Sequence, residues 1–442
     1  MNGDLLIRAA TLVDGSRTDI LVSDGRISAL GTSLSSAGAR IIDADGLLAL
    51  PGLVDLHTHL REPGYEHSET VLTGSRAAAA GGFTAVHAMA NTSPVADNAG
   101  VVEQVYSRGE AAGYATVRPV GAVTIGLGGT QLAEIGAMAG SRAQVRVFSD
   151  DGKCVADALL MRRALEYVKT FGGVVAQHAQ DPTLTDGAQM NEGTVSADLG
   201  LTGWPAVAEE SIIARDALLA HHVGARLHVC HLSTAGAVDV VRWAKARGIA
   251  ITAEVTPHHL FLTEESVRGY DARFKVNPPL RRAEDVAALR EGLADGTIDI
   301  IATDHAPHPR EAKECEWAAA AFGMVGLESA LSVVQASVID TGFLDWTGLA
   351  RVLSSTPARI GQLRGYDSGI VEGATEFTLY DPEARRAFDE SSLAGKGVNS
   401  PFLGTTLPGR VLATIHHGYP TVLDGELVEA EIVAANAGAH RG

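Results

Sequence analysis

Hydrophobic and polar positions follow one pattern up to about residue 50 and another pattern after it. In residues 5–43, apolar runs of four or five residues are separated by the turn dipeptides Asp14-Gly15 and Asp24-Gly25. An Asp-Gly pair between two apolar runs is typical of a tight turn that joins two strands. The first part of the chain is therefore predicted to form β-strands over residues 5–9, 19–22, 26–30 and 40–43.

After Pro51, short apolar runs alternate with longer, alanine-rich segments of helical pattern. Alternating strands and helices imply parallel strands joined by right-handed crossovers. Eight such units in succession predict an α/β fold of the (β/α)8 TIM-barrel type. The predicted strands are residues 53–59, 84–90, 116–123, 144–149, 174–178, 226–231, 250–255 and 298–304. The predicted helices include residues 70–80, 156–170, 206–222, 235–247 and 282–295.

An open, doubly wound sheet is the alternative for this middle part, but no Gly-x-Gly-x-x-Gly follows its first strand. The last part of the chain returns to short strands, predicted at residues 378–380, 411–416 and 420–423. Strands from both ends of the chain can pair, so we expect a small discontinuous β-sandwich beside the barrel. The predicted domains are residues 1–50 and 366–442 for the two parts of the sandwich and residues 51–365 for the barrel.

Composition and charge narrow the function. The 442 residues carry a formal net charge of −18, which argues against nucleic acid or an anionic membrane as a partner. The three cysteines form no Cys-x-x-Cys pair, so a reducing, cytoplasmic location is expected. We also expect no signal peptide and no membrane span, since no basic start precedes an apolar stretch and no apolar run is long enough to cross a bilayer.

Metal-ligand residue types stand where several predicted strands end. His57 and His59 are two residues apart in a strand, so their side chains project to the same side. In a (β/α)8 barrel the carboxyl ends of all strands meet at the catalytic rim. Four histidines and two aspartates at one rim exceed the three protein ligands of a single catalytic zinc, and they predict two ions that share a carboxylate. These ligands are His57, His59, His178, His231 and Asp304, together with one aspartate of the Asp150-Asp151 pair.

Two segments carry a resemblance to a known family. The segment DLHTHLREPG at residues 55–64 and the segment ATDHAPH at residues 302–308 resemble the two signatures of the dihydroorotases, which belong to the amidohydrolase superfamily. The resemblance covers essentially the whole chain and is closest to the longer, type I bacterial members. It implies a zinc enzyme with two Zn²⁺ per chain that interconverts dihydroorotate and N-carbamoyl-L-aspartate in pyrimidine biosynthesis.

The resemblance also implies a role for each ligand. His57, His59 and Asp304 would hold one metal, and His178 and His231 would hold the other. Many relatives bridge the metals with a carboxylated lysine on the fourth strand, but that strand contains no lysine here. The type I pattern implies Asp151 as the bridge, with Asp150 in the turn, and leaves Lys153 as the weaker alternative.

The same resemblance implies the catalytic and substrate groups. A hydroxide between the metals would attack the ring carbonyl, and Asp304 would act as the general base. Arg61, Asn91 and His308 would hold the substrate carboxylate, for which the planar guanidinium of Arg61 offers two parallel donors. Ring contacts would come from Asn277 and from the backbone near Phe322 and Gly323. The remaining histidines, including His87 and His228, have no assigned role, and His305 is expected to point away from Asp304 into the wall.

Two alternatives stay open at this point. A hydantoinase or allantoinase would share the metal ligands, although Arg61 favours a substrate ring that carries a carboxylate. A non-catalytic partner of aspartate transcarbamoylase is the alternative from another class, but such a partner should have lost ligands and none is missing here. The sequence leaves three questions open: whether the chain forms a homodimer, whether it forms a complex with aspartate transcarbamoylase, and which metal it holds in the cell.

Overall fold

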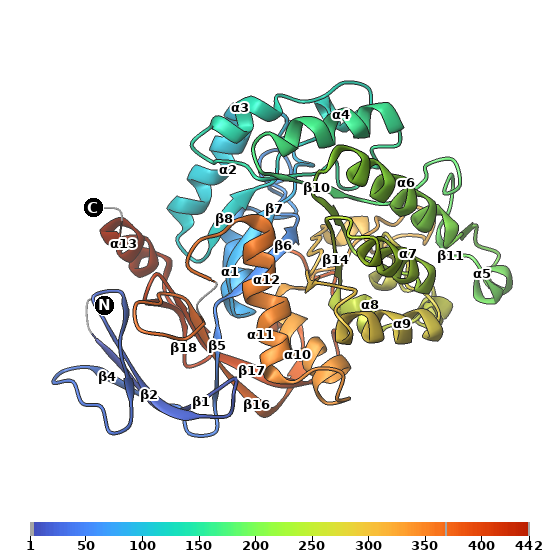
Figure 1. Ribbon diagram of the computed structural model, residues 1–442. Coiled ribbons are helices and arrows are strands. Elements are labelled where there is room, and N and C mark those ends of the chain that lie inside the picture. The colour runs from blue at the N-terminus through green and yellow to red at the C-terminus, as the bar shows by residue number, and fades with distance from the viewer. Residues whose placement is uncertain (1–3, 367–368, 441–442) are drawn as a thin grey trace.

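The computed structural model describes residues 4–366 and 369–440 (Figure 1). Its central feature is a set of eight parallel strands that follow one another in chain order. Three of them, β6, β7 and β8, form one sheet, and the other five form a second sheet in the order β15-β14-β13-β10-β9. Isolated parallel bridges from Thr58 to His305 and from Gly121 to Phe148 link the ends of these sheets. The strands are β6 (Leu53–Thr58), β7 (Phe83–Ala88), β8 (Thr116–Pro119), β9 (Val147–Phe148), β10 (Val174–Gln177), β13 (Leu227–Val229), β14 (Ile251–Val255) and β15 (Ile300–Ile301).

Helices connect these strands and pack around them (Figure 1). Several helices begin at a polar cap, as α1 does at Thr70 and α7 at Thr234, whose side chains accept a hydrogen bond from a backbone N–H of the first turn. Alanine and glycine on the inner faces let the helices approach the strands closely. The longer helices are α1 (Val71–Ala80), α2 (Ala99–Ala112), α4 (Ala158–Lys169), α6 (Val207–Val223), α7 (Ala235–Ala246) and α9 (Ala283–Ala294). The shorter ones are α3 (Ile135–Gly140), α5 (Thr194–Leu199), α8 (Pro257–Phe261), α10 (Ala330–Val334), α11 (Trp346–Ala350) and α12 (Thr356–Gly361).

Strands from both ends of the chain form a separate, nine-stranded sheet outside the barrel. Its order is β19-β18-β17-β16-β5-β1-β2-β3, with β4 paired to β1. The strand β5 joins the two halves, because it pairs with β1 on one side and with β16 on the other. The strands are β1 (Leu5–Leu12), β2 (Arg17–Ser23), β3 (Arg26–Gly31), β4 (Arg40–Asp43), β5 (Leu48–Pro51), β16 (Phe377–Phe388), β17 (Thr405–His416), β18 (Tyr419–Leu423) and β19 (Glu426–Leu427). A small strand pair, β11 (Met190–Asn191) with β12 (Gly203–Trp204), and a last helix, α13 (Ala430–His440), complete the main elements.

The structure confirms the α/β class, the eight parallel strands and the pairing of the two chain ends. The fourth and eighth strands are only two residues long, because the predicted residues on either side of them have irregular backbone. Sequence analysis missed β5, whose four residues are all buried and show no alternation, and it missed α2 and α13. The two-layer sandwich and the domain boundaries at residues 50 and 365 stay predictions.

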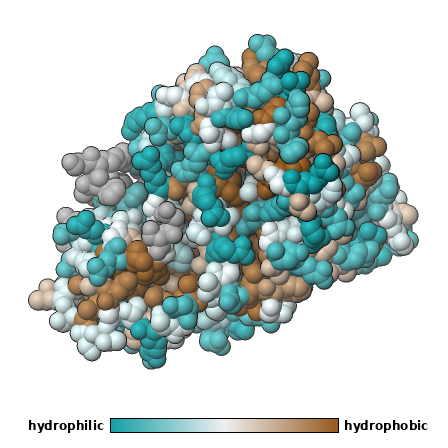
Figure 2. All heavy atoms as spheres, viewed as in Figure 1, coloured by the Kyte–Doolittle hydropathy of each residue, from teal (hydrophilic) through white to brown (hydrophobic). Residues whose placement is uncertain are grey.

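Hydrophilic side chains cover most of the face seen in Figure 2, and apolar side chains gather over the nine-stranded sheet at lower left. Among the described residues, no helix is both long and apolar enough to cross a membrane.

Candidate active site

The carboxyl ends of the barrel strands bring four predicted metal ligands together. His57 and His59, at the end of β6, both direct Nε2 toward Asp151 and Asp304. The distances from His57 Nε2 are 3.4 Å to Asp151 Oδ2 and 3.3 Å to Asp304 Oδ1. Those from His59 Nε2 are 3.2 Å and 3.0 Å to the same two oxygens. All four side chains are buried, so this is an enclosed cluster of imidazoles and carboxylates.

A second pair of histidines meets the other oxygen of the same aspartate. His178 Nδ1 and His231 Nε2 are 2.8 Å apart, and each lies 3.3 Å from Asp151 Oδ1. Asp151 therefore faces one histidine pair with Oδ2 and the other pair with Oδ1. This is the arrangement that a carboxylate bridging two cations requires.

The electrostatics of the cluster favour added positive charge. Burial would raise the pKa of Asp151, but the neighbouring imidazoles, His57 first, outweigh it and hold that pKa well below its ordinary value. Burial opposes the protonation of His57, yet the carboxylates of Asp151, Glu254 and Asp304 hold its pKa well above the ordinary value. The site thus attracts either protons or a metal ion, and metal ions displace protons from such ligands.

The donor set also fits a metal geometrically. His57 Nε2 is buried and has no hydrogen-bond partner, although it faces two carboxylates. Ligand atoms of His57, His59, Asp151 and Asp304 lie within 4.8 Å of one another, and so do those of Asp151, His178 and His231. Imidazole nitrogen and carboxylate oxygen are the ligands of zinc and similar divalent ions.

Unusual backbone conformations orient several side chains of the site. His231, Asp304 and Arg61 have φ values of 33°, 50° and 62°, in the left-handed region that most residues avoid. Each such residue costs about 1–3 kcal/mol and persists only where its surroundings fix it. Gly152, with φ 82°, directly follows Asp151 and turns the chain there.

A buried carboxylate behind the cluster orients His57. Glu254, in β14, accepts a hydrogen bond from His57 Nδ1 at 2.6 Å and a second from His228 Nε2 at 3.0 Å. His228 Nδ1 in turn lies 2.8 Å from Thr252 Oγ1. A metal-binding histidine commonly donates its second N–H to a carboxylate, which fixes its tautomer and orientation. Sequence analysis did not identify Glu254 and gave His228 no role, although Glu254 is the one acidic residue in the apolar strand Ile251–Val255.

The residues beside Asp151 have different surroundings. Asp150 Oδ1 accepts hydrogen bonds from the backbone N–H groups of Val123 and Thr124, at 2.8 and 2.9 Å, so it anchors the loop after β8. Lys153 is exposed and does not join the histidines. The structure therefore favours Asp151 over a modified Lys153 as the bridging group. His305 turns away from Asp304, as expected, because its Nδ1 accepts from the backbone N–H of Gly326 at 3.2 Å.

Two predicted substrate groups lie together beside the cluster. Arg61 Nη2 lies 3.4 Å from His308 Nε2, and Arg61 Nε donates to the carbonyl of Pro307 at 3.1 Å. Burial lowers the pKa of Arg61 to about 10, which leaves it charged at neutral pH. Burial and then the Arg61 guanidinium lower the pKa of His308 to about 3, so His308 is neutral and its Nε2–H donates to the Phe322 carbonyl at 2.8 Å.

The predicted amide groups lie near the histidine cluster, Asn91 in direct contact with it and Asn277 through Gln180. Asn91 Oδ1 lies 2.8 Å from His59 Nδ1, so Asn91 orients a histidine of the cluster. Gln180, which sequence analysis missed, accepts from His178 Nε2 at 2.7 Å and from Asn277 Nδ2 at 3.1 Å. Its position two residues after His178 was the available signal. Asn277 Oδ1 is buried without a hydrogen-bond partner and is available to a ligand.

The Phe322-Gly323 backbone is already largely engaged within the protein. The Gly323 N–H donates to the Lys275 carbonyl at 2.9 Å, and the Gly323 carbonyl accepts from Lys313 Nζ at 2.9 Å and from Asn399 Nδ2 at 3.1 Å. These bonds fix the loop beside His308. Contacts from this backbone to the substrate ring stay a prediction.

Comparisons with known proteins point to one enzyme family. A family model described as dihydro-orotase-like matches residues 46–237. A dihydroorotase of Leifsonia xyli subsp. xyli is 75% identical over 426 residues, which cover 96% of this chain and 97% of the relative. The chain belongs to the dihydroorotase family. Another family member, the dihydroorotase of Streptomyces coelicolor, is 63% identical and covers 96% of this chain and 99% of the relative.

Solved structures of related enzymes share the fold of this dihydroorotase family member. An L-hydantoinase from Arthrobacter aurescens has a TM-score of 0.84 at 24% identity, over 97% of this chain and 98% of its own. A dihydropyrimidinase from Brevibacillus agri has a TM-score of 0.82 at 21% identity, over 96% of each chain. Family membership and the histidine–aspartate cluster together support a cyclic amidohydrolase with a metal cofactor.

The two oxygens of Asp151 face different histidine pairs, and this leads to a first prediction. Protein purified without chelator should contain about two equivalents of metal, and Asp151→Ala should lose one or both and nearly all turnover. Asp150→Ala is the matched control, because it removes a loop anchor and leaves the ligands in place. Elemental analysis and turnover on the same samples measure both effects. Two retained metals in Asp151→Ala would show that this residue is not the bridge.

The hydrogen bond from His57 to Glu254 leads to a second prediction. Glu254→Gln keeps the shape but weakens the acceptor, so metal affinity should fall by about 10–100-fold, as for other groups behind a metal ligand. Competition with a fluorescent chelator measures this affinity. Glu376→Gln is the control, because Glu376 is also buried and bonded to a histidine, His416, but lies outside the cluster. Unchanged affinity in Glu254→Gln would contradict the orienting role.

Proposed function

We propose that this chain hydrolyses dihydroorotate reversibly to N-carbamoyl-L-aspartate, a step of pyrimidine biosynthesis, with two zinc ions. The observation that carries the proposal is the Asp151 carboxylate between two histidine pairs, with the Arg61 guanidinium beside it. The 75% identity to a dihydroorotase supports the choice of substrate. An assay of dihydroorotate, hydantoin and allantoin side by side tests it, and preference for either neutral compound would contradict it.

The ligands divide naturally between two ions. His57, His59 and Asp304 would hold one ion and His178 and His231 the other, with Asp151 between them. Bound ions of this kind supply an activated water and polarise the carbonyl that it attacks. The buried setting of all these ligands excludes bulk water, so charged groups interact more strongly here than at the surface.

Asp304 is the proposed proton acceptor. Burial would raise its pKa, but His57 and His59 outweigh it and lower the pKa to about 2, so the carboxylate is ionised at neutral pH. An ionised carboxylate at the attack site can take the proton of the attacking water and return it to the ring nitrogen that leaves. Proton transfer therefore needs no residue beyond those already in the cluster.

Arg61 is the proposed carboxylate receptor. It is charged, partly buried and next to the neutral His308, so its remaining N–H groups can pair with an anion at little cost in ordering. Asn91 contacts His59, and Asn277 is linked to His178 through Gln180, so both can position the substrate relative to the histidine pairs. A hydantoin ring carries no carboxylate, so this arrangement favours dihydroorotate over the hydantoinase alternative.

The complete ligand set argues against a catalytically inactive partner of aspartate transcarbamoylase. The proposal has four further parts: a cytoplasmic location, a homodimer, an association with aspartate transcarbamoylase, and a two-layer sandwich domain. Zinc as the ion, with two per chain, belongs to it as well.

Removal of the proposed base gives a third prediction. Asp304→Asn keeps the size of the side chain but cannot accept the proton, so kcat should fall by at least the roughly 10²–10⁴-fold typical of a lost general base. Metal analysis of the same variant separates lost proton transfer from lost metal. A kcat near the wild-type value would refute the assignment.

Removal of the substrate guanidinium gives a fourth prediction. Arg61→Met keeps bulk but loses charge-assisted hydrogen bonds worth about 1.5–3 kcal/mol each, so kcat/KM for dihydroorotate should fall at least about tenfold. Metal content should stay at the wild-type value. Loss of metal in Arg61→Met would make the residue structural and remove the argument for a carboxylated substrate.

A further inference from the structure

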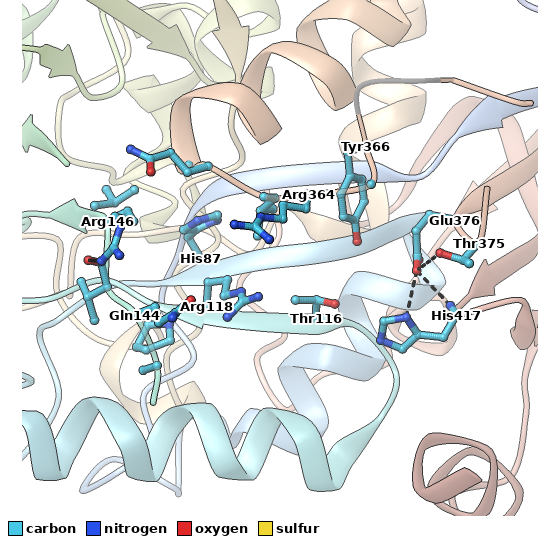
Figure 3. A pocket seen from close by; sticks show the side chains of 18 residues that line it. His87, Thr116, Arg118, Gln144, Arg146, Arg364, Tyr366, Thr375, Glu376 and His417 are labelled. Carbon is cyan, nitrogen blue, oxygen red and sulfur yellow. Dashed lines mark hydrogen bonds and ion pairs between the residues drawn. The ribbon is translucent and has the colours of Figure 1, made fainter. Parts of the chain in front are cut away.

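A cavity of about 850 Å³ lies at the other end of the barrel from the metal ligands. It is bounded by the starts of β8 and β9, by residues 361–366 after α12 and by the base of the nine-stranded sheet. None of the metal ligands lines it. Figure 3 shows that arginine, glutamine, threonine and tyrosine side chains surround it, which sets it apart from the apolar core.

Positive charge dominates this cavity. Arg118, Arg146 and Arg364 line it, and Arg118 and Arg364 reach toward its middle in Figure 3. Among the described residues, none of the three pairs with a carboxylate. Arg146 Nη1 donates to the carbonyls of Ala139 and Val145 at 2.9 and 2.8 Å, so its other N–H groups remain available. Three guanidinium groups in one cavity stand out in a chain of net charge −18.

Among the residues that the structure describes, one carboxylate lines the cavity, and it is already engaged. Glu376 lies 2.9 Å from His416 Nδ1 and 3.2 Å from His417 Nδ1. Burial would raise the pKa of Glu376, but its contacts with His416 and His417 outweigh it and lower the pKa to about 2, so the carboxylate is ionised at neutral pH. Both of its oxygens accept hydrogen bonds from these two residues. Three guanidinium groups thus share the cavity with one engaged carboxylate, and an excess of positive charge concentrates anions.

We propose that this cavity binds a small phosphate-bearing anion. A monocarboxylate has two oxygens and one charge, which is too little for three guanidiniums that have Gln144, Thr116 and Tyr366 beside them. A phosphate group offers three oxygens and up to two charges, and guanidinium is the side chain best matched to it. The volume is within the range of pockets that bind small metabolites.

One residue on the cavity wall contacts the strand that carries His57. His87, on its wall, has Nδ1 3.4 Å from the carbonyl of Asp55. The Asp55 carboxylate accepts from the backbone N–H groups of His57 and Thr303, at 3.0 and 3.1 Å, and so holds the strand ends that carry His57 and Asp304. An anion in this cavity would bind without displacing the substrate, since the two sites share no residue.

Calorimetric titration of the full-length, metal-loaded protein with inorganic phosphate tests the proposal. Wild type should bind phosphate, and acetate over the same concentration range should give no binding. The double variant Arg118→Gln/Arg364→Gln should weaken phosphate binding at least about tenfold, and the exposed Arg364→Gln alone should weaken it measurably. Turnover of dihydroorotate without phosphate should be unchanged in both, which separates this test from that of the proposed function.

Two controls make the result specific. Arg247→Gln removes a guanidinium that packs over Trp243 at 5.2 Å, much as Arg118 packs over Tyr106 at 5.5 Å. Because Arg247 lies outside the cavity, this variant should bind phosphate as wild type does. Asp151→Ala should also keep phosphate binding. Absence of binding in wild type, equal affinity for acetate, or unchanged affinity in the double variant would overturn the proposal. Binding lost in Asp151→Ala but kept in the double variant would place the phosphate at the catalytic site and overturn it as well.

Discussion

The buried negative charge at the end of the barrel strands is the constraint on which the rest of this structure depends. Asp151, Asp304 and Glu254 lie within one enclosed cluster, where carboxylates without a compensating charge cost several kcal/mol each. Four histidines supply only part of that compensation. The cluster is consequently stable only if the strand ends lie close together. Each imidazole or bound cation can then contact more than one carboxylate.

That convergence explains where the backbone departs from regular geometry. His231 and Asp304 adopt left-handed φ values where β13 and β15 end, and Arg61 does so just after β6. A regular strand would carry these side chains past the cluster. Asp55 then fixes the segment next to Asp304 through the backbone N–H of Thr303, and Asp150 anchors the loop after β8, which is a structural role for acidic residues.

The sequence was sufficient for the parts of the fold and the site that depend on local pattern. The alternation of apolar runs and alanine-rich segments located the barrel, and the spacing of His57 and His59 located its catalytic end. The pattern could not reveal Glu254, because a single buried acid in a strand has no periodicity. Its role depends on a hydrogen bond with His57, which is 197 residues away in the chain. Nor could the pattern reveal β5, whose role depends on two neighbours that are distant in sequence, or the cavity, which is lined by segments from six separate parts of the chain.

The position of β5 has a consequence for how the chain is made on the ribosome. Its partner β16 begins about 325 residues after β5 ends, so it leaves the ribosome long after β5 does. At about 5–20 residues per second, one edge of β5 stays unpaired for roughly 15–65 s of synthesis. An unpaired edge can accept a foreign strand during that time. Leu48 and Leu50 of β5 belong to the main apolar core, so a barrel that forms in the interval can cover one face of the strand while its edge waits for β16.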